Sequence, residues 1–342
     1  KNKYVGEFNF GYNGSENFAK GQRYGFFPSF ALGWLVSEEN FWAGMKETID
    51  FLKIRASWGQ AGNDQIGSER RFAYLTTMNT DAAGYHWGNN ADYQKDGVTE
   101  GDIGVNNLTW ETVTKKNVGI EFSIRSALRI QLDAFHEYRD NIFMQRRTIP
   151  TQAGLLSTPY ANFGKVKNQG GEVAITYNKK INQADISFFA NVSYAKNEIL
   201  EFDVPAGQQG THQDITGHSI NELYGYEAIG LYTAEDFDGS GNLLPELPQN
   251  ELAEVRPGDI KILDWNEDGV INSKDKGYVG GTNDPRMVYG FGGNISLHCF
   301  DFSVFFQGVG DTYRFIGDES EYFIPGSGQG IQGNIFTNYT DR

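Results

Sequence analysis

The sequence has no long hydrophobic run: nowhere does it approach the roughly 20 consecutive apolar residues that a membrane-spanning helix needs. It has one cysteine, Cys299, so no disulfide can form within the chain. It is also short of positive charge, because 29 Lys and Arg stand against 44 Asp and Glu, a net charge of -15. Nucleic-acid binding needs basic surfaces that neutralise phosphates, so we expect no nucleic-acid partner.

The chain does contain many aromatic residues and segments that alternate between apolar and polar residues. It has 25 Phe, 18 Tyr, 6 Trp and 42 Gly. In 184–196, for example, Phe188 and Val192 lie on one face and Asn191 and Ser193 on the other. Such alternation predicts strands, and we expect them at Tyr4–Tyr12, Tyr24–Val36, Phe51–Gly59, Lys116–Ile124, Leu128–Tyr138, Gly171–Lys179, Ala184–Lys196, Arg286–His298 and Asp301–Gly310.

The connections between these segments alternate between short and long. Tight turns are expected at 125–127, 180–183 and 299–300, whereas 60–115, 139–169 and 197–285 are long. This asymmetry is typical of an antiparallel transmembrane β-barrel. A soluble β-sandwich also alternates with period two, but its strands are shorter, and here aromatic residues gather near strand ends as in a membrane girdle. The barrel predicts that Ile120, Phe122, Phe188 and Val192 face lipid, and that Asn191 and Ser193 do not.

An ordered series of motifs covers almost the whole chain. They are Arg23-Tyr24-Gly25-Phe26-Phe27-Pro28-Ser29-Phe30, Leu52-Lys53-Ile54-Arg55-Ala56-Ser57-Trp58-Gly59, Trp110-Glu111, Asn162-Phe163-Gly164-Lys165-Val166-Lys167-Asn168, Asn191-Val192-Ser193-Tyr194-Ala195-Lys196-Asn197 and Tyr289-Gly290-Phe291. This series resembles the SusC/RagA-type TonB-dependent outer-membrane transporters of Bacteroidetes.

The resemblance implies a fold that this chain only partly supplies. The family's barrel has about 22 strands, of which we expect about nine to eleven here. Residues 1–342 are therefore expected to be a middle portion of one barrel domain, without the family's plug domain and C-terminal strands. We expect 197–285 to be a long extracellular loop region. We find no signal peptide at the start of the sequence.

The resemblance also implies a function in the bacterial outer membrane. The complete protein is expected to import oligosaccharides or other glycans, or oligopeptides. In such a family a SusD-like lipoprotein covers the extracellular mouth as a lid, and the N-terminal region couples to TonB–ExbB–ExbD. A siderophore or cobalamin receptor on the same fold is an alternative, and a secreted carbohydrate-binding β-sandwich is another. No carboxylate is backed by a nucleophile or catalytic motif, so we expect no enzyme.

The sharpest local motif is the loop 264–275. It places oxygen-bearing side chains at positions 1, 3, 5, 9 and 12, with Gly269 at position 6 for a sharp turn, as in calcium-binding loops. Asp275 stands where an EF-hand has Glu, and no helical pattern flanks the loop. An Asx-turn loop is the alternative. We expect a Ca²⁺ ion, with Asp264, Asn266, Asp268, Val270, Asn272 and Asp275 as its ligands.

A second candidate site lies in the polar segment 79–104, where Tyr85, Trp87 and Tyr93 stand among Asn, Asp and Gly. An aromatic face offers a large contact area at little conformational cost, so exposed rings in a loop could stack on substrate. Packing between loops is the alternative. We expect these three residues to bind substrate.

Overall fold

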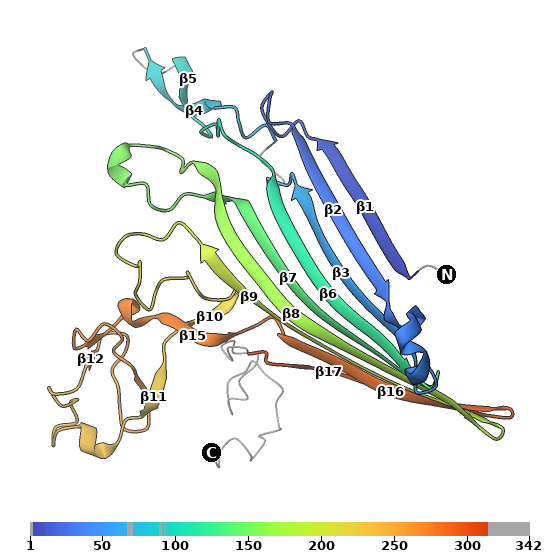
Figure 1. Cartoon of the computed structure of the whole chain (residues 1–342). Coiled ribbons are helices and arrows are strands. Elements are labelled where there is room, and N and C mark those ends of the chain that lie inside the picture. Colours follow the sequence, from blue (N-terminus) through green and yellow to red (C-terminus); the bar gives the residue numbers. More distant parts are fainter. Residues whose placement is uncertain (1–2, 67–70, 89–90, 92, 314–342) are drawn as a thin grey trace.

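The computed structural model describes residues 3–66, 71–88, 91 and 93–313. Its main element is a nine-stranded antiparallel sheet, ordered β1-β2-β3-β6-β7-β8-β9-β16-β17 (Figure 1). All the predicted strands are present, in the predicted order. Their bounds are β1 Tyr4–Gly14, β2 Tyr24–Leu35, β3 Ile49–Asn63, β6 Glu111–Ile124, β7 Leu128–Gln145, β8 Tyr160–Ile181, β9 Ala184–Glu201, β16 Met287–Leu297 and β17 Phe300–Gly310.

The connections alternate in length, as predicted. At one end of the strands, called here the tight-turn edge of the sheet, lie the tight turns 125–127, 182–183 and 298–299. The connection 36–48 lies at the same end and holds the short 3-10 helices η1 (Val36–Glu38) and η2 (Asn40–Met45). At the other end of the strands, the long-loop edge, lie the long connections 15–23, 64–110, 146–159 and 202–286. The short 3-10 helix η3 (Thr151–Ala153) lies in the third of them. Within the described residues, β1 and β17 each pair on one side only, so the sheet is an open part of a barrel.

Several strands run further than their sequence pattern predicts, β7 and β8 most of all. β7 continues to Gln145 rather than Tyr138, and β8 begins at Tyr160 rather than Gly171. The two strands stay paired beyond irregularities at Ile142, although alternation has faded there. Backbone pairing does not require one apolar face, and a strand that has left the membrane has water on both faces. The long loop expected at 139–169 is therefore only 146–159.

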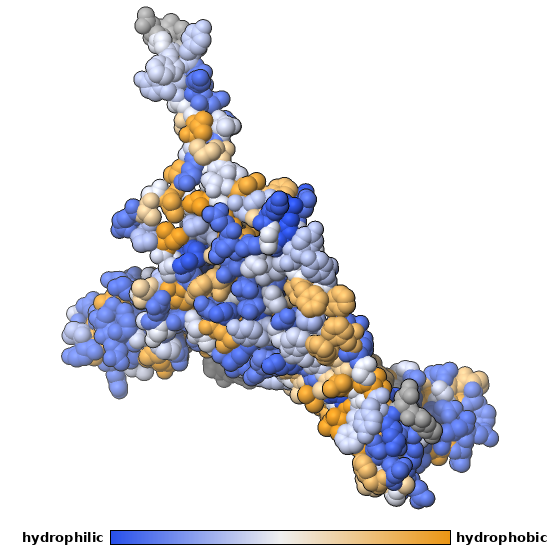
Figure 2. All heavy atoms as spheres, turned by 45° about the horizontal axis from the view of Figure 1, so that its top comes forward, coloured by the Kyte–Doolittle hydropathy of each residue, from blue (hydrophilic) through white to orange (hydrophobic). Residues whose placement is uncertain are grey.

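The long connections also contain strands that the sequence pattern did not predict. The hairpin of β4 (Met78–Trp87) and β5 (Tyr93–Glu100) lies within the expected loop 60–115, and Figure 2 shows it as a narrow arm standing clear of the sheet. The segment 202–286 is folded into three small two-stranded pairs, β10–β15, β11–β13 and β12–β14. Their bounds, with two 3-10 helices, are β10 Glu222–Gly225, β11 Ala228–Leu231, η4 Ala234–Asp236, β12 Gln249–Asn250, β13 Ile260–Ile262, β14 Val270–Ile271, η5 Ser273–Asp275 and β15 Gly277–Thr282.

One face of the main sheet carries successive cross-strand rows of apolar residues. A row of polar residues, Lys116, His136, Gln169 and Lys196, ends this apolar band on the side of the long loops. From Lys116 to the turn at Arg125 is roughly 30 Å of strand, or about 23 Å after a tilt of about 40°. That matches the ~25 Å apolar band of outer-membrane barrels. The rows are Val118-Ala134-Gly171-Tyr194, Ile120-Leu132-Val173-Val192, Phe122-Ile130-Ile175-Ala190 and Ile124-Leu128-Tyr177-Phe188.

A small hydrophobic core lies at the long-loop edge. The β2–β3 ladder ends at Ser29–Gly59, next to Pro28, which has no N–H to donate. Beyond that point the Phe27 side chain packs against Trp110, with ring centroids 5.3 Å apart. Four further buried residues complete this core and tie the loops 15–23 and 64–110 to the strands: Phe18, Ile66, Val105 and Leu108. Among the described residues, no helix is long and apolar enough to cross a membrane.

Candidate functional site

The second face of the sheet is polar, and it carries several ion pairs between neighbouring strands. The Arg55 guanidinium in β3 contacts the carboxylates of Asp133 in β7 at 2.7 Å and Glu121 in β6 at 3.4 Å. Gly119 is the cross-strand neighbour of Arg55, and a Cβ there would lie 2.8 Å from the guanidinium carbon. Because that side chain is missing, Arg55 can cross β6 and reach β7. The result is a hydrophilic wall with balanced charge.

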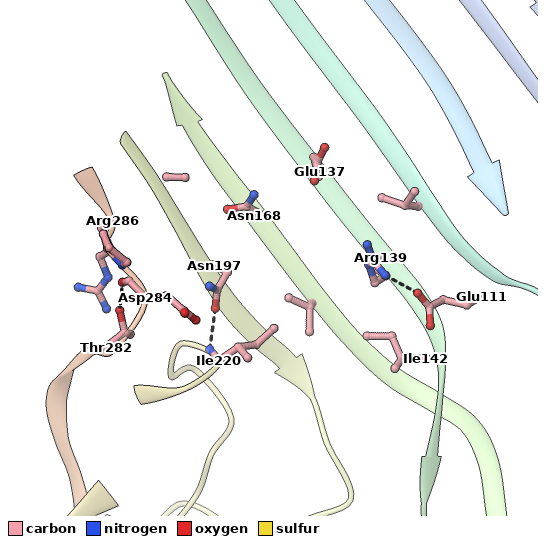
Figure 3. Close-up of a pocket in the computed structure, with 14 residues that line it drawn as sticks. Glu111, Glu137, Arg139, Ile142, Asn168, Asn197, Ile220, Thr282, Asp284 and Arg286 are labelled. Atoms are coloured by element: carbon pink, nitrogen blue, oxygen red, sulfur yellow. Dashed lines mark hydrogen bonds and ion pairs between the residues drawn. The ribbon is translucent and has the colours of Figure 1, made fainter. Parts of the chain in front are cut away.

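A pocket of about 520 Å³ lies on this polar face, near the long-loop ends of β6 to β9 (Figure 3). Strands form one side of it, and the end of the segment 202–286 forms the other. Its charged and polar lining residues are Glu111, Glu137, Arg139, Asn168, Asn197, Thr282, Asp284 and Arg286. Its remaining lining residues are Val113, Ile142, Val166, Ala195, Ile220 and Pro285.

The polar groups of the pocket differ in how fully they are engaged. Arg139 donates to Glu111, and Glu137 is paired with Lys115 at 3.0 Å. Asn197 accepts a hydrogen bond through Oδ1 from the backbone N–H of Ile220 at 2.6 Å, and within the described residues its Nδ2 has no acceptor. The Asn168 amide, which is half-buried, has no hydrogen-bond partner among the described residues. The pocket thus offers free amide groups beside ion pairs, while the carboxylate of Asp284 is bonded, among the described residues, only to the Asn221 amide.

A strap of residues 215–222 closes the pocket on the side opposite the strands. The Ser219 hydroxyl donates to the carbonyl oxygen of Asn197 at 2.8 Å and accepts from Arg286 Nη2 at 3.1 Å. Asn221 donates through Nδ2 to Asp284 at 2.9 Å. Arg286 also lies 3.6 Å from Asp311, while its Nε is buried without a partner among the described residues. These bonds fix the strap to the end of β9 and the start of β16.

Asp203 anchors the other side of the same loop region. Its carboxylate accepts from Arg146 Nε at 2.9 Å, from the backbone N–H groups of Arg147 and Thr148, and from the Thr148 hydroxyl. Burial alone would raise the pKa of this carboxyl group, but these donors outweigh it and lower the pKa to about 2. Asp203 therefore holds the β7–β8 loop against the chain that leaves β9.

Glu39 has a similar role at the tight-turn edge. Between η1 and η2, its carboxylate accepts from Lys3 Nζ at 2.9 Å, the Tyr4 hydroxyl at 2.7 Å and Trp34 Nε1 at 3.2 Å. These hydrogen bonds lower its pKa to about 2, with that from Lys3 contributing most. The connection 36–48 is thereby tied to the beginning of β1.

The aromatic residues predicted to bind substrate are brought together by the β4–β5 hairpin. Trp87 lies opposite Tyr93 across the hairpin, and the Tyr85 and Trp87 rings meet edge-on at 4.8 Å. All three are exposed, with relative accessibilities of 66%, 60% and 77% for Tyr85, Trp87 and Tyr93. This exposure leaves little of their surface to pack against another loop of the described chain. Their binding of substrate stays a prediction.

The predicted calcium loop is a series of Asx turns between β13 and β15. Asn266 and Asp268 each accept from a backbone N–H two residues ahead, at 3.1 and 3.0 Å. Buried Asp275 accepts from the backbone N–H groups of Trp265 at 3.1 Å and Asn272 at 2.8 Å. The Asx-turn interpretation therefore describes much of this loop. No helix of the α type flanks it, as expected.

One oxygen of this loop is left over. Asp264 accepts through Oδ2 from the backbone N–H of Gly269 at 2.8 Å, while its Oδ1 is buried without a partner among the described residues. Among all the described residues, no three His, Cys, Asp or Glu side chains come together in a way that could hold a metal ion. A cation here would thus rely on amide and carbonyl oxygens as well as carboxylates, and the predicted Ca²⁺ site stays a prediction.

The comparison with known proteins decides the family. The family described as "TonB dependent receptor-like, beta-barrel" matches residues 3–328. This chain belongs to that family. Among curated relatives, the TonB-dependent receptor P26 of Formosa agariphila is 30% identical over 300 residues, which are 87% of this chain and 29% of the relative. The TonB-dependent receptor SusC of Bacteroides thetaiotaomicron is 26% identical over 320 residues, 88% of this chain and 29% of SusC.

Solved structures show the same fold. The RagAB peptide importer in its open-open state superposes with a TM-score of 0.67 at 17% identity, covering 91% of this chain and 31% of that chain. The closed-closed state gives a TM-score of 0.65 at 14% identity, with 91% and 32% covered. The chain thus spans about a third of the length of the proteins that it matches.

Because the chain belongs to the TonB-dependent receptor family, the two faces of the sheet and the two ends of its strands can be assigned to their surroundings. The family's members are outer-membrane transporters and not enzymes, so the barrel interpretation is confirmed and the β-sandwich alternative is wrong. The apolar rows face lipid, and the polar face with its pocket lines the lumen. In barrels of this class the long connections lie on the extracellular side and the tight turns on the periplasmic side, and we expect the same arrangement here.

Proposed function

We propose that the complete protein imports oligosaccharides or oligopeptides across the outer membrane, energised by TonB–ExbB–ExbD. The observation that carries the proposal is the lumenal wall: an ion-paired hydrophilic surface with a pocket near the extracellular loops, backed by a continuous apolar outer face. A wall of this kind lets a polar solute pass through the barrel while the protein stays in lipid. The resemblance to SusC and to the RagAB peptide importer supports the same function.

A SusD-like lipoprotein is the proposed extracellular partner. The chain places most of its loop mass at the extracellular edge, where the segment 202–286 forms three small two-stranded pairs and the β4–β5 hairpin stands clear of the sheet. Such a surface suits a lid that covers the mouth and delivers captured nutrient. Coupling to TonB would use parts of the protein that precede this barrel region in the family.

Uptake assays test the import function. Cells with the complete gene should accumulate labelled oligopeptides or oligosaccharides, and cells that lack the gene should not. Accumulation should stop when TonB is deleted. Uptake that is the same with and without the gene, or that persists without TonB, would contradict the proposal. Specific uptake of a ferric siderophore or cobalamin instead would favour the alternative receptor class.

We also propose that Ca²⁺ binds the loop 264–275, through Asp264, Asn266, Asp268, the Val270 carbonyl, Asn272 and Asp275. The support is the spacing of oxygen ligands and the buried, unpartnered Oδ1 of Asp264. The ion would rigidify an extracellular loop. The proposed role of the ion is structural, and it takes no part in a reaction or in the transport step.

The exposed rings of Tyr85, Trp87 and Tyr93 are proposed to contact substrate or its carrier at the mouth. They form a cluster at the end of an arm that stands clear of the sheet, and exposed aromatic surface of this kind is available for binding. A contact at the mouth would act before the substrate reaches the lumenal pocket.

A further inference from the structure

We propose that the lumenal pocket bounded by β6–β9 and the strap binds a segment of peptide chain, so that the imported nutrient is peptide. The inference rests on the import function proposed above and names its substrate class. Nothing in the sequence motifs or the family comparison assigns a ligand to these residues. The argument comes from the free hydrogen-bonding groups, the apolar lining and the charge balance of the pocket.

Two asparagine amides provide the hydrogen-bonding groups. Asn168 and Asn197 are direct cross-strand partners, so their Cα atoms are about 4.5–5.5 Å apart. Within the described residues Asn168 has both its donors and its acceptor free, and Asn197 has its Nδ2 free. A peptide group presents one C=O and one N–H, and these are the complements of side-chain amides. The pair can therefore bracket one peptide bond of an extended substrate.

The apolar residues of the pocket suit the side chains of a peptide. Val113, Val166 and Ile142 come from the wall, Ile220 comes from the strap, and Pro285 lies just before β16. The pocket volume of about 520 Å³ lies in the range of small-ligand sites, which combine apolar walls with a few polar groups. A neutral oligosaccharide presents apolar C–H groups only on the faces of its rings, with hydroxyl groups around them, and would match this apolar surface less well.

The charges and the absence of aromatic residues argue against glycans. The pocket is lined by three carboxylates and two arginines, and each arginine already has a carboxylate partner, Arg139 with Glu111 and Arg286 with Asp311. This charge disfavours an anionic glycan. None of the 14 lining residues is aromatic, so a sugar ring has no face on which to stack.

The pocket is held in shape before any ligand enters. Ser219 and Ile220 are hydrogen-bonded to Asn197, and Arg286 is hydrogen-bonded to Ser219. The strap is therefore attached to the same residue that offers a free amide to the substrate. A site that is ordered beforehand loses less entropy on binding.

The test uses the purified complete protein in detergent, with Asn168→Leu as the variant and Asn178→Leu as its matched control. Asn178 lies in the same strand and on the same lumenal face, about 34 Å nearer the periplasmic turn. The probes are a tryptic digest of serum albumin and a mixture of oligosaccharides from starch and xylan. Bound ligands are separated from free ones and quantified by mass spectrometry, and thermal unfolding verifies that both variants are folded.

We expect peptides to bind, and N168L to weaken their binding about tenfold while N178L leaves it unchanged. Equal peptide binding by wild type and N168L would overturn the assignment of the pocket. Binding of oligosaccharides alone, or of neither probe, would overturn the peptide assignment. TonB-dependent uptake measured in cells separates these results from a failure of the import function, because uptake of another nutrient would leave that function standing.

Discussion

Asn168 in β8 lies directly opposite Asn197 in β9, on the lumenal face of the sheet. One of the two amides has no partner among the described residues, while the other holds the strap through its Oδ1 and leaves its Nδ2 free. A fixed loop and a free binding group thus meet at one position of the wall. The relationship links the architecture of the barrel to the substrate that we propose for it.

The assignment of faces predicts opposite effects at two adjacent residues of β9. Val192 belongs to a lipid-facing apolar row, and Ser193 points into the lumen. Val192→Arg should lower the free energy of unfolding in lipid vesicles by about 2–4 kcal/mol, since it places a charge near the middle of the bilayer. Ser193→Arg should cost much less. Urea titration of the complete protein in vesicles measures both, and equal costs would contradict the register.

Asp203 predicts a loss of stability in acid. Its pKa is about 2 in the folded protein against an ordinary value of 3.8, so its hydrogen bonds stabilise the fold fully above pH 3.8. That stabilisation is lost as the pH falls through about 2. Asp203→Asn should therefore lower the thermal midpoint at pH 7, and the difference from wild type should disappear toward pH 2.

The thermal midpoint of both proteins between pH 2 and 7 measures this effect. Glu246→Gln is a control in the same segment, because the Glu246 side chain is exposed and its carboxylate has no partner among the described residues, so its thermal midpoint should follow that of wild type at every pH. A difference at Asp203 that grows rather than shrinks in acid would show that its carboxylate is not the stabilising form.

The calcium proposal predicts that the loop 264–275 resists proteolysis only when Ca²⁺ is present. Asp264→Asn keeps an acceptor for the backbone N–H of Gly269 but removes the charge beside the buried Oδ1. We expect Ca²⁺ to slow cleavage of the wild-type loop and not that of D264N. Asp238→Asn, in a turn where Asp238 accepts from Ser240 and Asn242, is the control. The same cleavage rate with Ca²⁺ and with EDTA would refute the site.

If the exposed rings of the β4–β5 hairpin capture substrate, removing one of them should weaken substrate capture without unfolding the protein. Trp87→Ala should raise the half-saturating substrate concentration for uptake several-fold, because ring contacts contribute about 0.5–1.5 kcal/mol beyond burial. The maximal rate should stay the same. Val98→Ala, at another exposed position of the hairpin, is the control. If W87A and V98A had the same half-saturating concentration, the arm would have no part in capture.

The sequence predicted the order of the strands because a membrane forces strict alternation where lipid and lumen meet the sheet. The sequence pattern did not predict the strands outside the membrane, where lipid no longer covers one face. These are the extension of β8 back to Tyr160, the hairpin around Trp87 and the strand pairs of 202–286. In these regions water covers both faces, and pairing leaves little trace in the pattern.

The pocket shows the same limit. The tight turn at 182–183 sets the register that places Asn168 opposite Asn197, so this pair could have been found by counting outward from the turn. The contacts of Arg286 and Ser219 could not, because they depend on how a folded segment returns to the wall. The role of Asp203 was missed for a related reason, since its donors are backbone N–H groups and side chains of 146–148, more than 50 residues away in the sequence.

A structure of the complete protein with a bound peptide mixture tests the central claim most directly. The account predicts ligand density on the lumenal wall between β8 and the strap, within hydrogen-bonding distance of Asn168 and of Asn197 Nδ2. Peptide bound elsewhere in the lumen, with this pocket empty, would contradict it.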